Sequence, residues 1–158
     1  MCKIIQRMWL LMDSVDINLL RLLQEDSRRS YIDLAKSVGI SETAIRRRIK
    51  KLIDEKVIER FTVKLNPDKI GKPITAFIGV DVGGEIGPVA GSELLNRKEI
   101  SELYTITGDF DIIMKVSCGS VKELEKTIEF TRKMDFAHKT KTYVVLNRLK
   151  ESDLSLEG

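Results

Sequence analysis

The sequence contains little cysteine, histidine, proline or aromatic residue, and each shortage argues against a class of protein. Its two cysteines, Cys2 and Cys118, lie far apart, so they form no disulfide framework and a reduced cytoplasm is the simplest compartment. A single histidine argues against histidine-based metal sites and histidine-dependent triads. No apolar run approaches the roughly 20 residues that span a bilayer. We therefore expect a cytoplasmic protein without a catalytic site, metal, cofactor or membrane partner.

The composition is typical of a soluble, folded chain of one large domain or two small ones. Hydrophobic residues make up 42% of the 158 residues and charged residues 32%. The formal net charge is only +3, so the placement of the charges, rather than their sum, must identify a partner. The apolar segment 1–11 allows two interpretations: an additional helical turn, or a start codon upstream of a natural start at Met12.

Three short helices are predicted near the N-terminus, because each apolar stripe follows a residue that caps helices well. They span residues 14–25, 31–38 and 42–55, and their caps are Asp13, Ser30 and Ser41. Gly39 is expected to end the second helix in the left-handed conformation. The short connection that follows it predicts a compact helical unit.

The third predicted helix carries the strongest signal in the chain. At about 100° per residue, one face is apolar, with Ile45, Ile49, Leu52 and Ile53. The opposite face holds Thr43, Arg47 and Lys50, with Arg46 and Lys51 at its edges. Residues 46–51 include five basic side chains and no acidic one.

Two helices joined by residues 38–41, the second one amphipathic and basic, are typical of a DNA-binding helix-turn-helix. The apolar face would anchor the second helix, leaving the basic face free to enter a major groove. Basic residues there neutralise phosphates, and arginine also reads guanine. Arg28 and Arg29, just before the second predicted helix, are candidates to clamp the DNA backbone. A solvated charged face without a DNA partner is the alternative.

The rest of the chain alternates apolar and polar residues, as half-buried strands do. A strand over 57–65 precedes a turn at Asn66-Pro67-Asp68. The expected order thereafter is strand 74–82, helix 88–96, strand 102–107, strand 112–117, helix 121–133 and strand 140–149. This is the βαββαβ order of the ferredoxin-like fold. One sheet with both helices on one face leaves the other face for a second subunit.

These elements predict an α+β protein with two domains. A helix-turn-helix domain for DNA binding covers residues 13–62, and a linker strand and hinge cover 63–73. A ferredoxin-like domain for oligomerisation covers 74–149, and 150–158 form a polar tail.

The sequence resembles the Lrp/AsnC, or feast/famine, family of transcription regulators. The resemblance rests on DSRRSYIDLAKSVGIS, RRRIKKLIDEKVIERFTVKLNPDKIG and GDFDIIMKV, and it covers residues 13–149, nearly the whole chain. It implies a winged-helix-like DNA-binding domain joined to a ferredoxin-like effector domain over residues 74–149. It also implies a sequence-specific regulator that forms dimers, and possibly octamers, and binds an amino acid between dimers. Matching positions on the family's DNA-facing surface are Arg28, Ser30, Ser41, Thr43, Arg46, Arg47 and Lys50.

The resemblance also implies an effector site at a glycine–aromatic–aspartate turn. Gly108, Phe110 and Asp111 match that turn, and Asp109 lies within it. An aspartate there would bind the amino group of an amino acid through a charge-assisted hydrogen bond. A plain hairpin turn, with Gly108 supplying a positive φ, is the alternative.

The chain departs from the family pattern at three places. Lys56 stands where a glycine usually ends the third helix, so either Lys56 adopts the left-handed conformation or the last turn frays. Phe110 replaces a more frequent tyrosine, and Asp135-Phe136-Ala137 replaces a glycine–valine pair before the last strand. The last two changes bear on the ligand rather than on the fold.

Two other functions are kept as alternatives. An architectural protein that binds DNA without sequence choice needs the same basic helix. An enzyme similar to sirohaem decarboxylases, some of which resemble this family, would be expected to use histidines near the porphyrin, and this chain has one, His138.

Overall fold

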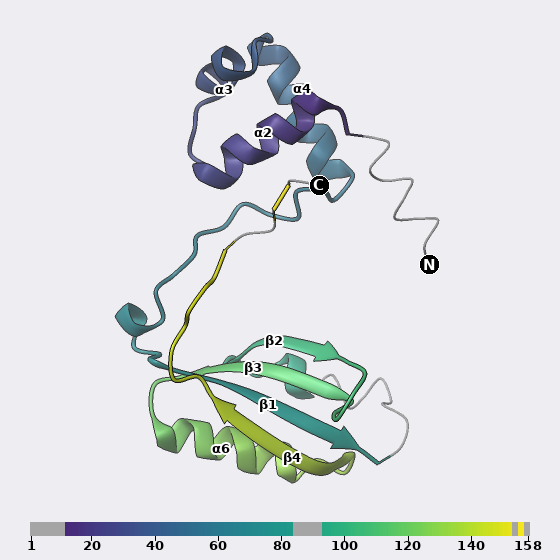
Figure 1. Ribbon diagram of the computed structural model, residues 1–158, viewed down its shortest axis with the longest axis vertical. Coiled ribbons are helices and arrows are strands. Elements are labelled where there is room, and N and C mark those ends of the chain that lie inside the picture. Colours follow the sequence, from purple (N-terminus) through teal and green to yellow (C-terminus); the bar gives the residue numbers. More distant parts are fainter. Residues whose placement is uncertain (1–11, 84–92, 153–154, 157–158) are drawn as a thin grey trace. The chain divides into compact units, whose positions relative to one another are not determined.

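The structure, a computed structural model, describes residues 12–83, 93–152 and 155–156 (Figure 1). These residues form two compact units. One contains the residues up to Val63 together with those from Glu151 onward, and the other is Lys64–Lys150. Segment 1–11 and most of the predicted helix 88–96 lie outside the described residues, while residues 93–95 are helical.

The first unit contains three helices, α2 (Ser14–Glu25), α3 (Tyr31–Val38) and α4 (Glu42–Asp54). The three predicted caps are confirmed, because the side chains of Asp13, Ser30 and Ser41 accept hydrogen bonds from backbone N–H groups in the first turns. Gly39 ends α3 with a φ of 78°. Each helix therefore begins where a polar side chain replaces a missing backbone partner.

The core of this unit is formed by the apolar faces of the three helices. Leu19, Leu34 and Ile45 are fully buried, one from each helix. Leu156, from the segment predicted as a polar tail, packs against the same core. The sequence placed Ile53 on the buried face of α4, but this is wrong: its side chain is 42% exposed.

Just after the end of α4 at Asp54, the chain passes through a residue with a left-handed backbone. Lys56 has a φ of 57°, and the N–H groups of the next two residues donate to the carbonyl of Leu52 at 2.8 and 3.0 Å. The left-handed conformation is thus the one adopted, and it satisfies carbonyls that the helix end would otherwise leave open.

The predicted strand over 57–65 is absent. This segment has no regular secondary structure and pairs with no strand in the described part of the chain. Phe61, Val63 and Leu65, the alternating apolar residues behind the prediction, are 51%, 75% and 57% exposed. An alternating pattern specifies which face of a strand is apolar, but the strand itself needs a hydrogen-bonding neighbour.

The second unit is a four-stranded sheet with helix α6 (Val121–Arg132) on one face (Figure 1). The strands are β1 (Ile74–Val82), β2 (Ile100–Thr105), β3 (Ile112–Cys118) and β4 (Ala137–Val144). Their order is β2-β3-β1-β4, and every neighbouring pair is antiparallel. The α+β class and the ferredoxin-like arrangement are confirmed.

The core of the sheet lies on the α6 side. Ala76, Ile78 and Val80 of β1 are fully buried there, opposite Met114 and Val116 of β3. Cys118 lies in the same core, and burial raises the pKa of its thiol. It is a packed residue, as expected.

The last strand differs from the prediction. β4 begins at Ala137 and ends at Val144, rather than spanning 140–149. Its pairing with β1 ends at Ala76 opposite Val144, and one further bond joins the Val145 N–H to the Thr75 carbonyl at 2.9 Å. The apolar pattern continues to Leu149, but Leu146 and Leu149 are 88% and 95% exposed.

Candidate nucleic-acid interface and effector loop

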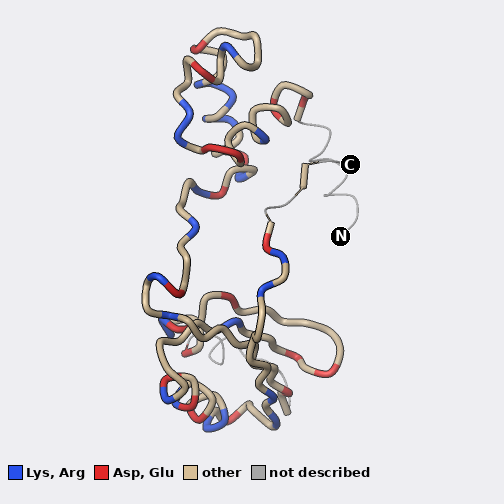
Figure 2. The backbone as a smooth tube through the Cα atoms, turned by 60° about the vertical axis from the view of Figure 1, so that its left-hand side comes forward, with Lys and Arg blue, Asp and Glu red and all other residues tan. Residues whose placement is uncertain are grey.

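The basic side chains of α4 differ in their partners. Arg46 donates to Glu42 at 2.6 Å, Lys50 forms an ion pair with Asp54 at 3.0 Å, and Lys51 approaches Glu55 at 3.9 Å. These are exposed pairs four residues apart, so each contributes only a few tenths of a kcal/mol. Both Lys and Arg positions and Asp and Glu positions occur along the backbone of the helical unit (Figure 2). An incoming phosphate can displace such weak partners.

Arg47 is the exception on this helix. It is exposed, and its guanidinium forms no hydrogen bond or ion pair within the described part of the chain. Thr43, one turn earlier, is exposed as well. The sequence placed both residues opposite the buried face, and the burial of Ile45 and Ile49 bears out that orientation. α4 therefore presents an open guanidinium on its outward face.

Arg46 has a second contact that the sequence did not indicate. Its guanidinium carbon lies 4.6 Å from the centre of the Tyr31 ring, on α3. A cation over an aromatic ring is attracted by the ring's negative face. This contact joins the two helices of the helix-turn-helix at one edge of the basic face.

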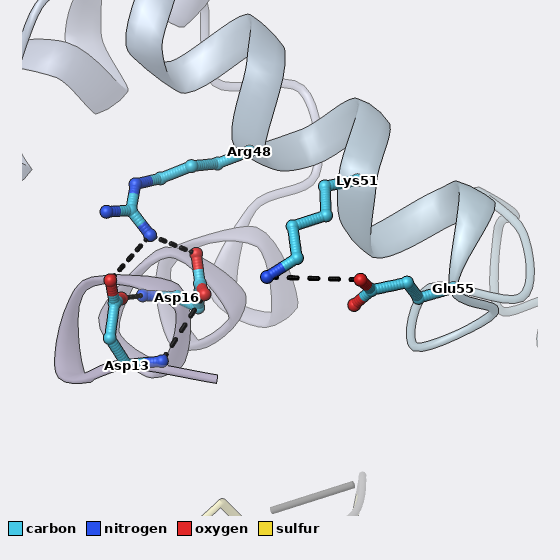
Figure 3. Close-up of polar contacts among 5 residues, drawn as sticks. All are labelled: Asp13, Asp16, Arg48, Lys51 and Glu55. Carbon is cyan, nitrogen blue, oxygen red and sulfur yellow. Dashed lines mark hydrogen bonds and ion pairs between the residues drawn. The ribbon is translucent and has the colours of Figure 1, made fainter. Parts of the chain in front are cut away.

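Arg48 is turned away from the outward face. Its Nη1 lies 2.8 Å from Asp13 Oδ2 and 2.7 Å from Asp16 Oδ1, both at the start of α2 (Figure 3). These two carboxylates raise the pKa of Arg48. One of the five basic residues in the run is thus an internal partner, and sequence reasoning missed this because periodicity does not show which helix faces the edge of α4.

The remaining predicted DNA-facing residues lie at the turns between helices. Arg28 lies 3.3 Å from Asp26, and Arg29 lies 2.9 Å from Glu25. Ser30 Oγ donates to Asp33 at 2.6 Å while it accepts the Asp33 N–H. Ser41 accepts the Ala44 N–H at 3.2 Å. The two serines therefore hold helix N-termini, whose N–H groups favour a nearby phosphate.

The predicted effector turn lies between β2 and β3, where Gly108 has a φ of 133°. Asp111 is engaged within the fold: its N–H donates to the Val80 carbonyl at 3.0 Å, and its Oδ2 accepts the Val82 N–H at 2.7 Å. The register between β1 and β4 shifts between Asp81 and Val82. Asp111 thus accepts a hydrogen bond from a backbone N–H at the irregular end of β1, a role that the sequence did not predict.

Phe110 covers the middle of the sheet on the face away from α6. It lies over Gly79 and forms an edge-on contact with Tyr143, with ring centres 6.5 Å apart. Lys141 Nζ is 5.7 Å from the Phe110 ring centre. On the same face, Lys115 forms an ion pair with Glu102 at 2.8 Å, which lowers the pKa of Glu102.

The four predicted effector residues do not line the cavity of about 520 Å³ found elsewhere in this unit. That cavity lies between the segment before β1 and the segment after β4, and includes Lys64, Asn66, Thr75, Leu146 and Arg148 in its lining. Gly108 and Asp109 are exposed at the tip of their turn.

Among the described residues, no group of three or more histidine, cysteine or acidic side chains could hold a metal ion. No described helix is long and apolar enough to cross a membrane.

Comparison with known proteins identifies the family. Residues 12–53 match the AsnC-type helix-turn-helix domain, and residues 75–154 match the Lrp/AsnC ligand binding domain. The chain belongs to the Lrp/AsnC family of transcriptional regulators. The matched segments place α2, α3 and α4 in the helix-turn-helix domain and the four-stranded sheet in the ligand-binding domain.

Individual members of the family are similar over nearly their whole length. An HTH-type transcriptional regulator from Pyrococcus furiosus is 37% identical over 145 residues, which are 92% of this chain and 97% of the relative. The structure of AsnC from E. coli has a TM-score of 0.85 and 28% identity, covering 91% of this chain and 98% of that one.

A transcriptional regulator from Neisseria meningitidis, solved as a complex with L-Met, shows the same fold with a TM-score of 0.81 and 21% identity. It covers 89% of this chain and 94% of that chain. The matched families and relatives are transcriptional regulators rather than enzymes, so the decarboxylase alternative is set aside.

Proposed function

We propose that this Lrp/AsnC regulator binds double-stranded DNA sequence-specifically in the cytoplasm by inserting α4 into the major groove. The observation that carries the proposal is the outward guanidinium of Arg47, which has no hydrogen bond or ion pair among the described residues. The opposite face of its helix is anchored by buried Ile45 and Ile49. Thr43, Arg46 and Lys50 flank it. Arg28, Arg29, Ser30 and Ser41 would contact the backbone beside the groove.

A fluorescence-anisotropy titration tests this proposal. The purified chain is titrated with its own upstream DNA and with scrambled DNA of the same length, at about 50 and 200 mM salt. A protein that neutralises some 6–10 phosphates loses about 10³–10⁵ in affinity over that range. Preference for its own DNA at the higher salt supports specific regulation. Equal binding of both DNAs favours the architectural alternative, and no binding at low salt refutes DNA binding.

We infer that the active form is at least a dimer. The sheet face away from α6 carries Phe77, Phe110 and Tyr143, and no described helix of the same unit covers it (Figure 1). Three apolar side chains of the predicted strand 57–65 are exposed as well, those of Phe61, Val63 and Leu65. A second copy would cover both, and would set two basic helices about one DNA turn apart on a pseudo-palindrome. An octamer is the larger assembly that the family suggests.

We also propose that an amino acid modulates DNA affinity or oligomeric state through the turn of Gly108, Asp109, Phe110 and Asp111. L-Met bound to a protein of the same fold supports this class of ligand. Because Gly108 and Asp109 are exposed, a second copy would have to complete the pocket. Coupling of this kind typically amounts to about 1–3 kcal/mol.

A thermal-shift screen against the common amino acids tests the effector. One amino acid should raise the midpoint, and Asp111→Asn should keep the fold while losing that shift. The asparagine oxygen can still accept the Val82 N–H, but it carries no charge for an amino group. If no amino acid moves the midpoint of the unchanged protein, the effector proposal is wrong.

A further inference from the structure

The two acidic residues at the start of α2 and Arg48 form a closed hydrogen-bonded ring (Figure 3). Asp13 Oδ1 accepts the Asp16 N–H at 2.8 Å, and Asp16 Oδ2 accepts the Asp13 N–H at 3.4 Å. The other oxygen of each carboxylate accepts from Arg48 Nη1, at 2.8 and 2.7 Å. All four carboxylate oxygens therefore have a partner, and a single guanidinium nitrogen joins the cap of α2 to the middle of α4.

Burial makes this ring different from the other ion pairs of the helical unit. The Asp16 side chain is 3% exposed and that of Arg48 is 26% exposed, whereas the side chains of Lys50 and Asp54 are 77% and 60% exposed. A buried carboxylate that loses its partner is strongly unfavourable, whereas an exposed pair can separate at little cost. α4 therefore cannot rotate away from α2 without leaving the Asp16 charge unpaired.

The ring also has a counterpart on the other side of α4. Successive residues are about 100° apart around a helix, so Arg46 and Arg48 flank Arg47 on either side. Arg48 is held by α2 through the ring, and Arg46 is held by Tyr31 of α3. The direction of Arg47, which lies between them, depends on both attachments.

We propose that Asp13, Asp16 and Arg48 are positioning residues for DNA recognition: the ring sets the rotation of α4 and so directs Arg47 outward. This inference rests on the proposed DNA binding. The three residues act through α4 and touch no DNA themselves.

The charge-removing variant Asp16→Asn distinguishes this role from a general electrostatic one. It removes a negative charge from a DNA-binding unit, so long-range electrostatics alone would tighten DNA binding. The positioning role requires the opposite result. We expect the dissociation constant for the chain's own DNA to rise about tenfold, the effect of losing one good base contact, with a smaller change for scrambled DNA.

Further variants complete the test in the full-length chain. Arg48→Met should give a similar loss, and the double variant Asp16→Asn with Arg48→Met should be no worse than either alone, because both break the same ring. Arg48→Lys keeps one charged nitrogen that can donate to both carboxylates, but on a shorter side chain, so we expect it to retain part of the discrimination between the two DNAs. Leu23→Val, at the far end of α2, is the control for destabilisation without damage to the ring.

All titrations are made at a temperature where circular dichroism shows each variant fully folded. If Asp16→Asn or Arg48→Met does not fold, the milder Asp13→Asn and Arg48→Lys decide, and each should still reduce discrimination more than Leu23→Val does. A folded Asp16→Asn that binds its own DNA as tightly as the unchanged protein, or more tightly, overturns the positioning role alone. Failure of the unchanged protein to bind any DNA overturns the proposed function and this inference together.

Discussion

The Phe110 ring lies against Gly79 so closely that a Cβ on the glycine would come within 2.6 Å of Phe110 Cδ2. Gly79 pairs with Ile113 of β3 and Lys141 of β4, so the ring covers the centre of the sheet. The Phe110 ring occupies the space that a side chain at position 79 would fill. The turn that carries the candidate effector residues is thereby held against the sheet.

Gly79→Ala should displace the Phe110 ring and destabilise the sheet unit. Overpacking of this kind typically costs about 1–3 kcal/mol. Urea denaturation measures the loss. In a Phe110→Ala background the space is already vacant, so the same Gly79→Ala substitution should cost much less. Equal costs in both backgrounds would show that the ring does not occupy this space in solution.

Lys56→Gly should stabilise the helical unit by about 0.5–1 kcal/mol, because a lysine side chain disfavours the left-handed backbone that Lys56 adopts and glycine does not. The measurement is the urea midpoint followed by circular dichroism. Lys36→Gly is the matched control: Lys36 is exposed within α3, where glycine should destabilise. If both substitutions changed the urea midpoint in the same direction, the result would contradict the left-handed backbone at Lys56.

The stability of the helical unit should fall in acid. The Asp16 N–H and then Arg48 lower the pKa of Asp13 below its ordinary value of 3.8. A lowered carboxyl pKa contributes stability that is present above the ordinary value and is lost as the pH falls through the lowered one. Unfolding midpoints should therefore decrease below about pH 4. Asp13→Asn, which still caps α2, should flatten that decrease, and an unchanged pH profile in this variant would argue against the ionised cap.

Arg47→Ala should weaken DNA binding more than Lys36→Ala does. If Arg47 contacts a phosphate, the slope of log affinity against log salt should become shallower by about 1 per site. If Arg47 contacts a base, the affinity for the chain's own DNA should decrease, with little change in the affinity for scrambled DNA. Equal behaviour of the two variants would place Arg47 away from the DNA.

Val63→Asp should reduce self-association. Val63 is 75% exposed and lies in the segment 57–65, which pairs with no strand in the described part of the chain. A charge at this position would be buried by a second copy. Light scattering coupled to gel filtration gives the molar mass. Lys64→Asp is unsuitable as the control, because Lys64 has a contact of its own within the chain. The control is Glu59→Asp, which alters a side chain of the same segment and keeps its charge. An unchanged mass for Val63→Asp would exclude this segment from the interface.

The helices of the first unit were predictable from the sequence because their determinants are local. Asp13, Ser30 and Ser41 act within one turn of their own positions, and the left-handed Gly39 ends α3 where predicted. The order of the four strands and of α6 was predictable for a similar reason, since strand alternation and helical periodicity are evident over short windows of sequence. The same periodicity predicted that Thr43, Arg47 and Lys50 lie on the exposed face of α4.

Contacts between distant residues were decided by the tertiary structure. Arg48 belongs to the same basic run as Arg47, and only the position of Asp16 in the first turn of α2, 32 residues earlier, turns it into an internal partner. The motif around Asp111 predicts a ligand-binding residue. In the structure its side chain accepts a hydrogen bond from the Val82 N–H, 29 residues away in the sequence. The segment 57–65 has the pattern of a strand, but it pairs with no strand among the residues that the structure describes. Sequence thus determined what each residue prefers locally, whereas pairing depends on which distant groups the fold brings within hydrogen-bonding distance.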